Sequence, residues 1–375
     1  MNWNPTWICP ANDLGDPAAV FGTSFVFEKK ITHANLTITA MGVYEAILNG
    51  RRVGQFVMAP GWTSYHKRLQ YQEYDITDLL TNGKNEIEVT VGKGWYRSPL
   101  PGWLGCAYQD ELRSRPCGLA AQITLTFEDG SSKILSTNES WKVSDGPVRF
   151  SEIYDGEIYD AAKTPSLDQS VSIFDGPTDT LILQQGEEVC EQERLAVKKV
   201  FVTPNGETVL DFGQNMTGYV ELFVNAKAGD CVDLSFAEVM DKEGNFYTEN
   251  YRSAKAQYHY ICKDGIQTWH PSLTFYGFRY IRINDFPGGI DCVKPENFTA
   301  IAVHSNMKRT GFLSSSNTLL NQLFSNIIWG QKGNFLDVPT DCPQRDERLG
   351  WTGDAQVFVR TACLNYDAEK FFTKW

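Results

Sequence analysis

The chain has 375 residues, and its formal net charge of -12 with a pI near 5.0 argues against nucleic acids and anionic membranes as partners, because both would repel it. No apolar run reaches the ~20 residues of a membrane span, and the N-terminus lacks the features of a secretory signal. Nine cysteines without CxxC spacing favour free thiols, so we predict a cytoplasmic protein of two or three compact units.

Residues 1–190 are predicted to form an N-terminal β-sandwich or jelly roll. Short runs that alternate apolar and polar residues, such as 86–91, are separated by turn signals such as Asn49-Gly50. Aromatic residues gather in three predicted loops, at 60–65, 94–96 and 101–103. One interpretation is an exposed surface that stacks on sugars; the other is the sandwich core, where large aromatic residues are found more often.

Residues 195–305 are predicted to form a second β-sandwich. The segments 218–224 and 275–283 alternate with a period of two, which is typical of a half-buried sheet. Three polar residues of this unit are interpreted as buried groups that satisfy backbone atoms between units: Gln214, Asn215 and Arg279. The histidines of the unit lack the spacing of metal ligands, so no metal is assigned to them.

The periodicity changes near residue 306, where helices are expected. Ser316 or Asn317 is placed to cap a first helix. Its apolar residues recur at helical spacing: Leu319, Leu320, Leu323, Ile327 and Ile328. A second helix is predicted over 355–366. The segment between the helices should be a loop, because it contains residues that oppose regular structure: Pro343, Gly350 and Gly353.

This loop carries the side chains of a candidate active site. Between Asp341 and Asp354 it holds four carboxylates, two guanidinium groups and one indole. Closely spaced acids push one carboxyl towards its protonated form while an arginine holds others ionised, so the loop offers the acid and the anion that glycoside hydrolysis needs. The flat indole of Trp351 favours a sugar over a metal or phosphate ligand. The alternative is a solvated loop in which Arg345 and Arg348 form surface ion pairs.

The segment 337–356, DVPTDCPQRDERLGWTGDAQ, resembles the active-site signature of bacterial α-L-rhamnosidases, the inverting glycosidases of family 78. The resemblance implies that Glu347 is the general acid. It also implies that four residues line the rhamnose pocket: Asp341, Arg345, Trp351 and Asp354. The family's catalytic base is a glutamate far downstream in the barrel, and the resemblance places it beyond Trp375.

Other segments resemble the remaining domains of that family. The N-terminal β domain is matched by the runs 44–54, 60–65, 71–80 and 155–161, and the concanavalin-like domain by runs between 209 and 283. In some members the N-terminal domain uses calcium, so the resemblance implies a Ca²⁺ site whose ligands stay unplaced; no other cofactor is expected. The predicted fold is therefore mainly β, with the first helices of an (α/α)6 barrel at 306–375.

The implied function is hydrolysis of terminal α-L-rhamnose from glycosides or glycans, with this chain as an N-terminal part that is inactive alone. A non-catalytic rhamnose-binding protein and an assembly role with a separate chain stay open as alternatives, as does association into a homo-oligomer. Because a partial barrel leaves apolar helix faces without partners, we expect the C-terminal helical segment to be poorly ordered or packed against a neighbouring molecule.

Overall fold

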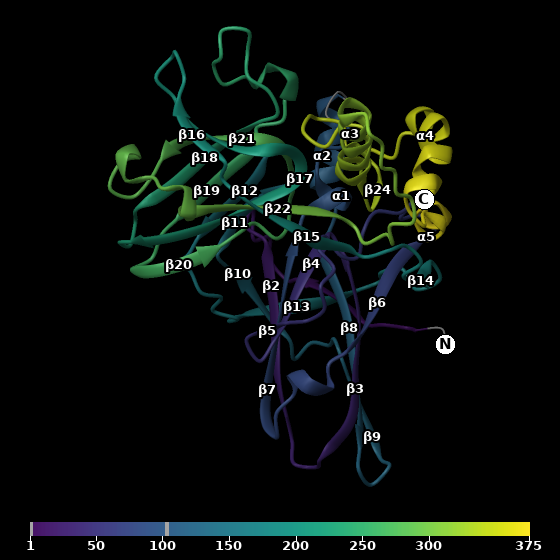
Figure 1. The fold of residues 1–375 in the computed structure, drawn as a ribbon. Helices are drawn as coiled ribbons and strands as arrows, with labels where there is room; N and C mark the ends of the chain where they lie inside the picture. The colour runs from purple at the N-terminus through teal and green to yellow at the C-terminus, as the bar shows by residue number, and fades with distance from the viewer. Residues whose placement is uncertain (1–2, 102–104) are drawn as a thin grey trace.

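The computed structural model describes residues 3–101 and 105–375. Its strands form two large curled sheets, and the long helices lie at the C-terminal end of the chain (Figure 1). The predicted mainly β fold class is thus confirmed. Trp103, in one of the predicted aromatic loops, lies outside the described residues.

The first sheet is built almost wholly from the N-terminal part of the chain. Among the described residues it has 12 strands. They are β1 (Trp7–Pro10), β2 (Ala19–Phe27), β3 (Ile31–Met41), β4 (Val43–Leu48), β5 (Arg51–Arg52), β6 (Leu69–Asp75), β7 (Gly83–Gly92), β8 (Gly118–Phe127), β9 (Ser132–Ser136), β10 (Lys142–Asp145), β13 (Gln169–Phe174) and β14 (Leu181–Leu183). Two short helices separate β7 from β8: α1 (Gly94–Arg97) and α2 (Cys106–Arg113).

Alternation along the strands gives this sheet one buried face. In β7, Ile87 and Val89 are fully buried while Glu86 and Glu88 face outwards or lie half-buried. The sheet folds over so that its two halves face each other, because β6 and β4 lie near opposite ends of the strand order and yet are joined by a buried side-chain contact. Tyr44 of β4 donates a hydrogen bond from Oη to Oε1 of Gln72 in β6 over 2.8 Å. The result is a sandwich.

Most strands of the second sheet come after the strands of the first sheet in the sequence. Its 10 strands, counted over the described residues, have the order β11-β12-β19-β18-β21-β17-β22-β15, with β16 and β20 paired to β17. They are β11 (Val148–Glu152), β12 (Gly156–Asp160), β15 (Val189–Ala196), β16 (Lys199–Val202), β17 (Thr208–Ala226), β18 (Cys231–Ala237), β19 (Gln257–Ile261), β20 (Gly265–Trp269), β21 (Tyr276–Asp285) and β22 (Phe298–Ser305). Short 3-10 helices occupy Thr77–Leu79, Glu249–Tyr251, Ile290–Cys292 and Pro295–Asn297.

The two β units are not strictly consecutive in sequence. Strands β11 and β12 lie within the stretch assigned to the first unit, but β12 pairs in parallel with β19 of the second sheet. The chain then returns to the first sheet with β13 and β14. Gly156 has a positive φ of 89°, and a Cβ there would meet the carbonyl oxygen of Gln257 at 2.0 Å. The crossing therefore depends on a glycine at this position.

Three helices complete the described chain: α3 (Thr318–Asn334), α4 (Thr352–Asn365) and α5 (Glu369–Lys374). Asn317 caps α3, since its side chain accepts from the backbone N–H of Leu319 over 3.0 Å. A small hairpin, β23 (Phe335–Leu336) with β24 (Val338–Pro339), follows α3.

Helix α4 begins three residues earlier than predicted. Gly353 and Asp354 therefore belong to its first turn, and the expectation that Gly353 lies outside regular structure is wrong.

The helical segment packs on the chain's own second sheet. Helix α3 contacts β17 and β22, and Thr217 donates a hydrogen bond from Oγ1 to the carbonyl of Gly333 over 2.6 Å. A small core that includes Ile328, Phe335 and Phe371 joins the helices to each other. The segment thus has contacts on its own chain, and its poor order or association with a neighbouring molecule in solution stays a prediction. Its apolar outer face is exposed, however, as the sequence predicts: Leu319 is 79% exposed and Leu323 is 55% exposed.

Two further expectations about side chains are tested by the fold. Trp95 of the predicted aromatic loops is 3% exposed and stacks on half-buried Trp62 at 6.3 Å between ring centroids, which favours the core interpretation. Arg279 forms two hydrogen bonds of 2.8 Å with Asp211 of the same sheet, and Asn215 is exposed. Gln214 is half-buried and donates to the Asn215 carbonyl. The interpretation of these polar residues as buried groups between units is therefore wrong.

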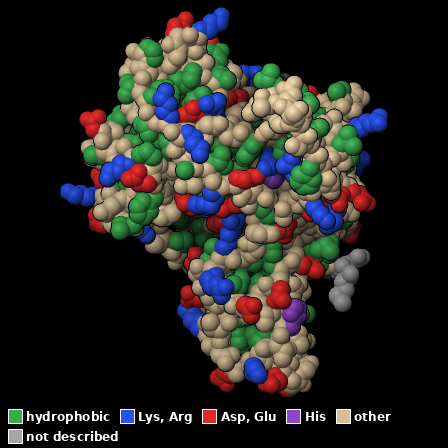
Figure 2. All heavy atoms as spheres, in the orientation of Figure 1, with side chains coloured by type: hydrophobic (Ala, Val, Ile, Leu, Met, Phe, Trp, Pro, Cys, Tyr) green, Lys and Arg blue, Asp and Glu red, His purple; other side chains and the backbone are tan. Residues whose placement is uncertain are grey.

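The surface carries charges of both signs. Figure 2 shows acidic and basic side chains interspersed over one face of the molecule, without a basic stripe. Within the described residues, no helix is both long enough and apolar enough to cross a membrane.

Candidate active site

The loop that joins α3 to α4, residues 335–351, is anchored by a buried arginine. The side chain of Arg348 is fully buried and donates to the carbonyl oxygens of Ile153 and Phe275, the latter over 2.7 Å. It also donates to the carbonyl of Gln344 over 3.0 Å. Burial lowers the pKa of Arg348 to about 10. The alternative in which Arg348 forms a surface ion pair is wrong, because this guanidinium attaches the loop to backbone of the β units.

A buried ion pair fixes the start of the loop. The carboxylate of Asp337 accepts from Nζ of Lys374 in α5 over 2.7 Å and from the backbone N–H of Trp62 over 2.5 Å. A Cβ at Gly61 would meet this carboxylate at 2.6 Å. Asp337 has a positive φ of 65°, as does Asp341 at 63°. The surrounding contacts therefore hold the loop in a backbone shape that non-glycine residues adopt rarely.

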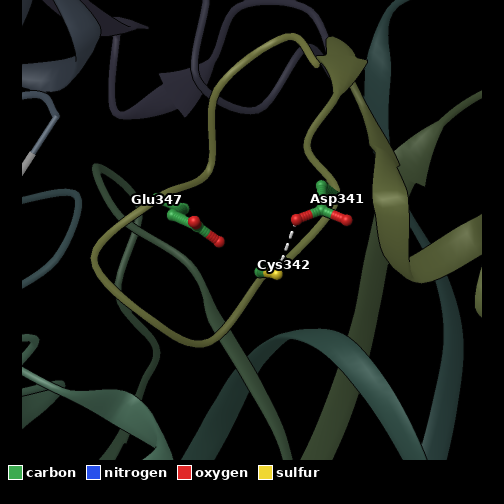
Figure 3. A group of neighbouring side chains, drawn as sticks. All are labelled: Asp341, Cys342 and Glu347. Atoms are coloured by element: carbon green, nitrogen blue, oxygen red, sulfur yellow. Dashed lines mark hydrogen bonds between the residues drawn. The ribbon is translucent and has the colours of Figure 1, made fainter. Parts of the chain in front are cut away.

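Three side chains of the loop converge on one point (Figure 3). Single ligating atoms of Asp341, Cys342 and Glu347 all lie within 4.8 Å of one another. The thiol of Cys342 donates to Oδ2 of Asp341 over 2.8 Å. Arg345 donates from Nε to Oε2 of Glu347 over 2.6 Å, and its Nη2 lies 3.7 Å from Oδ2 of Asp341. The loop thus places one arginine between two carboxylates, as the residue types predict.

Asp354 joins this group from the first turn of α4. Asp341 and Asp354 line a hollow of about 150 Å³ between α3 and α4, together with Phe335 and Phe358. Trp351 lies half-buried immediately before α4, where its backbone N–H donates to the carbonyl of Pro339 over 3.2 Å. Within the part of the chain that the structure describes, Trp351 is not among the residues that line this hollow. The structure thus brings Asp341, Arg345, Glu347 and Asp354 together and places Trp351 at the end of the loop, before α4.

The carboxyl groups differ in their affinity for a proton. Burial raises the pKa of Asp341, and the neighbouring charges of Asp354 and Glu347 raise it further. Burial also raises the pKa of Glu347, but hydrogen bonds from Cys342 and Arg345 and the charge of Arg252 outweigh it, so the net shift is downwards. The pKa values of the two carboxyls are thus shifted in opposite directions, and the raised one belongs to Asp341 rather than to Glu347. The role of Glu347 as general acid stays a prediction.

Comparisons with known protein families cover nearly the whole chain. Residues 29–198 match the alpha-L-rhamnosidase N-terminal domain, and residues 201–304 match the bacterial alpha-L-rhamnosidase concanavalin-like domain. Residues 308–375 match the bacterial alpha-L-rhamnosidase 6 hairpin glycosidase domain, which includes the loop described above. The chain belongs to the bacterial α-L-rhamnosidase family.

Individual rhamnosidases agree with this result. A curated alpha-L-rhamnosidase from Formosa agariphila is 39% identical over 367 residues, which cover 94% of this chain and 39% of the relative. The crystal structure of an α-L-rhamnosidase from Aspergillus terreus matches with a TM-score of 0.93 and 39% identity, over 99% of this chain and 44% of that one. The structure of the Streptomyces avermitilis enzyme complexed with L-rhamnose matches with a TM-score of 0.89 and 39% identity, over 96% of this chain and 35% of that one. The chain spans about two fifths of the length of the Formosa relative.

A loop of the second β unit, residues 251–255, also contributes to the candidate site, whereas its sequence indicated only a resemblance to the concanavalin-like domain. Arg252 lies 3.3 Å from Asp346 and 3.5 Å from Glu347, measured between guanidinium nitrogens and carboxylate oxygens. Ser253 donates to Asp346 over 2.6 Å. Both residues lie more than 80 positions before the signature at 337–356, so only the folded chain brings them together.

A metal ion fits this group of side chains poorly. Among the described residues, Asp341, Cys342 and Glu347 are the one group of three His, Cys, Asp or Glu side chains close enough to share an ion. Arg345 already contacts both carboxylates, and its positive charge opposes a cation at the same point. This group lies outside the N-terminal unit, and the Ca²⁺ site implied there stays a prediction.

Proposed function

We propose that this chain is the N-terminal part of an inverting α-L-rhamnosidase that removes terminal α-L-rhamnose from glycosides or glycans. The observation that carries the proposal is the convergence of Asp341, Arg345 and Glu347 beside Asp354, within the segment that matches the glycosidase domain. Such a set can hold sugar hydroxyls and transfer a proton to a leaving oxygen.

Glu347 is the proposed general acid, so it must carry a proton when the substrate is bound. In the structure its ionised form is stabilised by Cys342 and Arg345. A neutral sugar that accepts hydrogen bonds from Arg345 would draw the guanidinium away from Glu347 and exclude water from it. Both changes raise the pKa of Glu347 and favour the protonated acid. A second carboxylate, ~6.5 to 9.5 Å away in inverting enzymes, activates water, and we place it beyond Trp375.

The proposed pocket would favour rhamnose over mannose. Asp341, Arg345 and Asp354 would hold hydroxyls, while Trp351 covers the apolar edge near the methyl group. Mannose has a hydroxymethyl group in place of that methyl group, and an indole would leave its 6-hydroxyl unsatisfied. Trp351→Ala should therefore weaken rhamnose binding. It should also lower the ratio of rhamnoside hydrolysis to mannoside hydrolysis. Equal hydrolysis of the two glycosides by the unmutated enzyme would contradict the pocket.

The direct test measures release of rhamnose from an aryl α-L-rhamnoside. The longer protein should hydrolyse this compound, while the purified 375-residue chain should not, because it lacks the proposed base. Circular dichroism and tryptophan fluorescence of the chain would establish that it is folded. A longer protein that binds rhamnose without releasing it would favour the non-catalytic alternative. Hydrolysis by the chain itself would require a base among Asp341, Asp346 and Asp354.

A further inference from the structure

A second and larger hollow adjoins the candidate site on the side of the second β unit. Its volume is about 350 Å³, which is sufficient for one sugar ring, and it lies between β17, α3 and the signature loop. The side chains that matter for ligand chemistry come from three places: Gln214, Asn215 and Glu238 from the second β unit, Trp329 from α3, and Cys342 and Gln344 from the loop.

The lining has the hydrogen-bonding character of a sugar site. Asn215 donates to Oε1 of Glu238 over 3.0 Å, so the two side chains form a joint polar surface. Oε1 of Gln344 is buried and has no hydrogen-bond partner among the described residues. Burial raises the pKa of Glu238, and its carboxyl oxygens supply further acceptor atoms to the lining. Hydroxyl groups donate and accept, and they match amide and carboxyl groups of this kind.

The hollow begins where the bond to be broken would lie. Asp341 and Cys342 line it, and their side chains meet Glu347 within 4.8 Å. Asp341 also lines the smaller hollow beside Asp354, between α3 and α4. The converging side chains thus separate two cavities. If the terminal rhamnose contacts Asp341, Arg345 and Asp354, the group to which it is attached extends towards Cys342 and the larger cavity.

We infer that this larger cavity binds the sugar residue to which the terminal rhamnose is attached, with Asn215, Glu238 and Gln344 as its hydrogen-bonding groups. The inference rests on the proposed rhamnosidase function and assigns it a substrate class, rhamnosides of hydroxylated pyranoses. A flat aromatic leaving group would leave these polar side chains unsatisfied. A phosphorylated group is disfavoured because Glu238 and Asp341 are the charged side chains that line the cavity.

The test compares two substrates of the longer enzyme that differ only in the leaving group. One is rhamnose linked to glucose, and the other is nitrophenyl α-L-rhamnoside. Asn215→Ala and Glu238→Gln should lower kcat/KM for the disaccharide by about 10- to 100-fold, the effect of losing hydrogen bonds to a polar or charged group. Hydrolysis of the nitrophenyl compound should change little. Glu243 is an exposed acid that, like Glu238, follows strand β18. Glu243→Gln is therefore the matched control and should leave both rates unchanged.

Each other outcome has a separate meaning. Equal loss on both substrates would overturn the inference, because the residues would then support the loop rather than the leaving sugar. Unchanged disaccharide hydrolysis in both variants would overturn it too. Failure of the unmutated enzyme on both substrates would instead contradict the proposed function, and the inference would fall with it. Saturation-transfer NMR of methyl glucoside with the 375-residue chain gives an independent readout, and the signal should be lost in Glu238→Gln but not in Glu243→Gln.

Discussion

The β units and the helical segment differ in how completely they bury their apolar side chains. Ile38 in the first sheet and Leu273 beside the second are fully buried. In the helices, by contrast, Leu319 is 79% exposed and Val357 is 81% exposed. The β units have cores of their own, whereas α3 and α4 present apolar faces that further chain could cover. The candidate site lies at the boundary between these two regions, so its stability and its chemistry should depend on different residues.

The largest effect should be catalytic and confined to the loop. In the longer enzyme, Glu347→Gln should lower turnover of an unactivated rhamnoside by about 10² to 10⁴, the usual cost of losing general acid catalysis. A rhamnoside with a very acidic leaving group should lose less, because its departure needs little protonation. Turnover measured on both substrates checks this prediction, and near-normal turnover of the unactivated one would exclude Glu347 as the acid. Substrate affinity should be largely retained.

The next effect concerns stability. Leu273 is fully buried between the units, and its side chain approaches Gly92 of β7 closely. Leu273→Ala should lower the free energy of unfolding by about 2 to 5 kcal/mol. Leu319→Ala, at an exposed position of α3, should change it by less than about 0.5 kcal/mol. Urea denaturation of the 375-residue chain compares the two, and similar losses would mean that the helical face is covered in solution.

A buried acid in the β region should make stability depend on pH. Glu157 of β12 is fully buried, and burial raises its pKa from 4.5 to about 8. Below the pKa of the unfolded state, Glu157 is protonated in both states and its contribution to stability is fully present. As pH rises, the unfolded state loses this proton first, so the free energy of unfolding falls until pH passes the folded pKa. Stability should therefore fall between pH 4.5 and about 8 in the unmutated chain and fall less in Glu157→Gln. Urea titrations at several pH values measure the difference, and parallel curves would contradict it.

The smallest effect should come from the loop that reaches the site from the second β unit. Arg252 lowers the pKa of Glu347. Arg252→Gln should raise this pKa, so the alkaline limb of the pH profile of kcat/KM should move to higher pH, since a general acid acts when protonated. Lys263→Gln, an exposed cation at the end of β19, is the control and should leave the profile unchanged. A shift to lower pH in Arg252→Gln would be inconsistent with this contact.

Local patterns were sufficient to predict the element types and the segment in which the charged side chains gather. The cap at Asn317, the alternating strands and the dense charges around Glu347 are all features of neighbouring residues. Which of the carboxyls has a raised pKa and which a lowered one could not be predicted from these local patterns. Asp341 carries the raised pKa because Asp354 and burial act on it, while Glu347 is paired with cations. These effects depend on distances between side chains from several segments.

Long-range pairings could not be predicted from the sequence. Strand β12 has the same alternation whichever sheet it joins, and only its parallel pairing with β19 assigns it to the second. Arg348 was weighed as a surface cation because arginine is usually exposed, but it binds the carbonyls of Ile153 and Phe275. Arg252 is remote from the signature in sequence, and no local pattern links the two.

The crossing of β11 and β12 into the second sheet limits how the chain can be divided. A cut near residue 190 would separate β12 from β19, leaving the first product with an unpaired hairpin and the second with an open edge at β19. Strands with unpaired edges tend to associate with other chains. Exchange of the N-terminal unit between relatives, in evolution or in the laboratory, would therefore require the hairpin of residues 148–160 to remain with the second sheet that it completes.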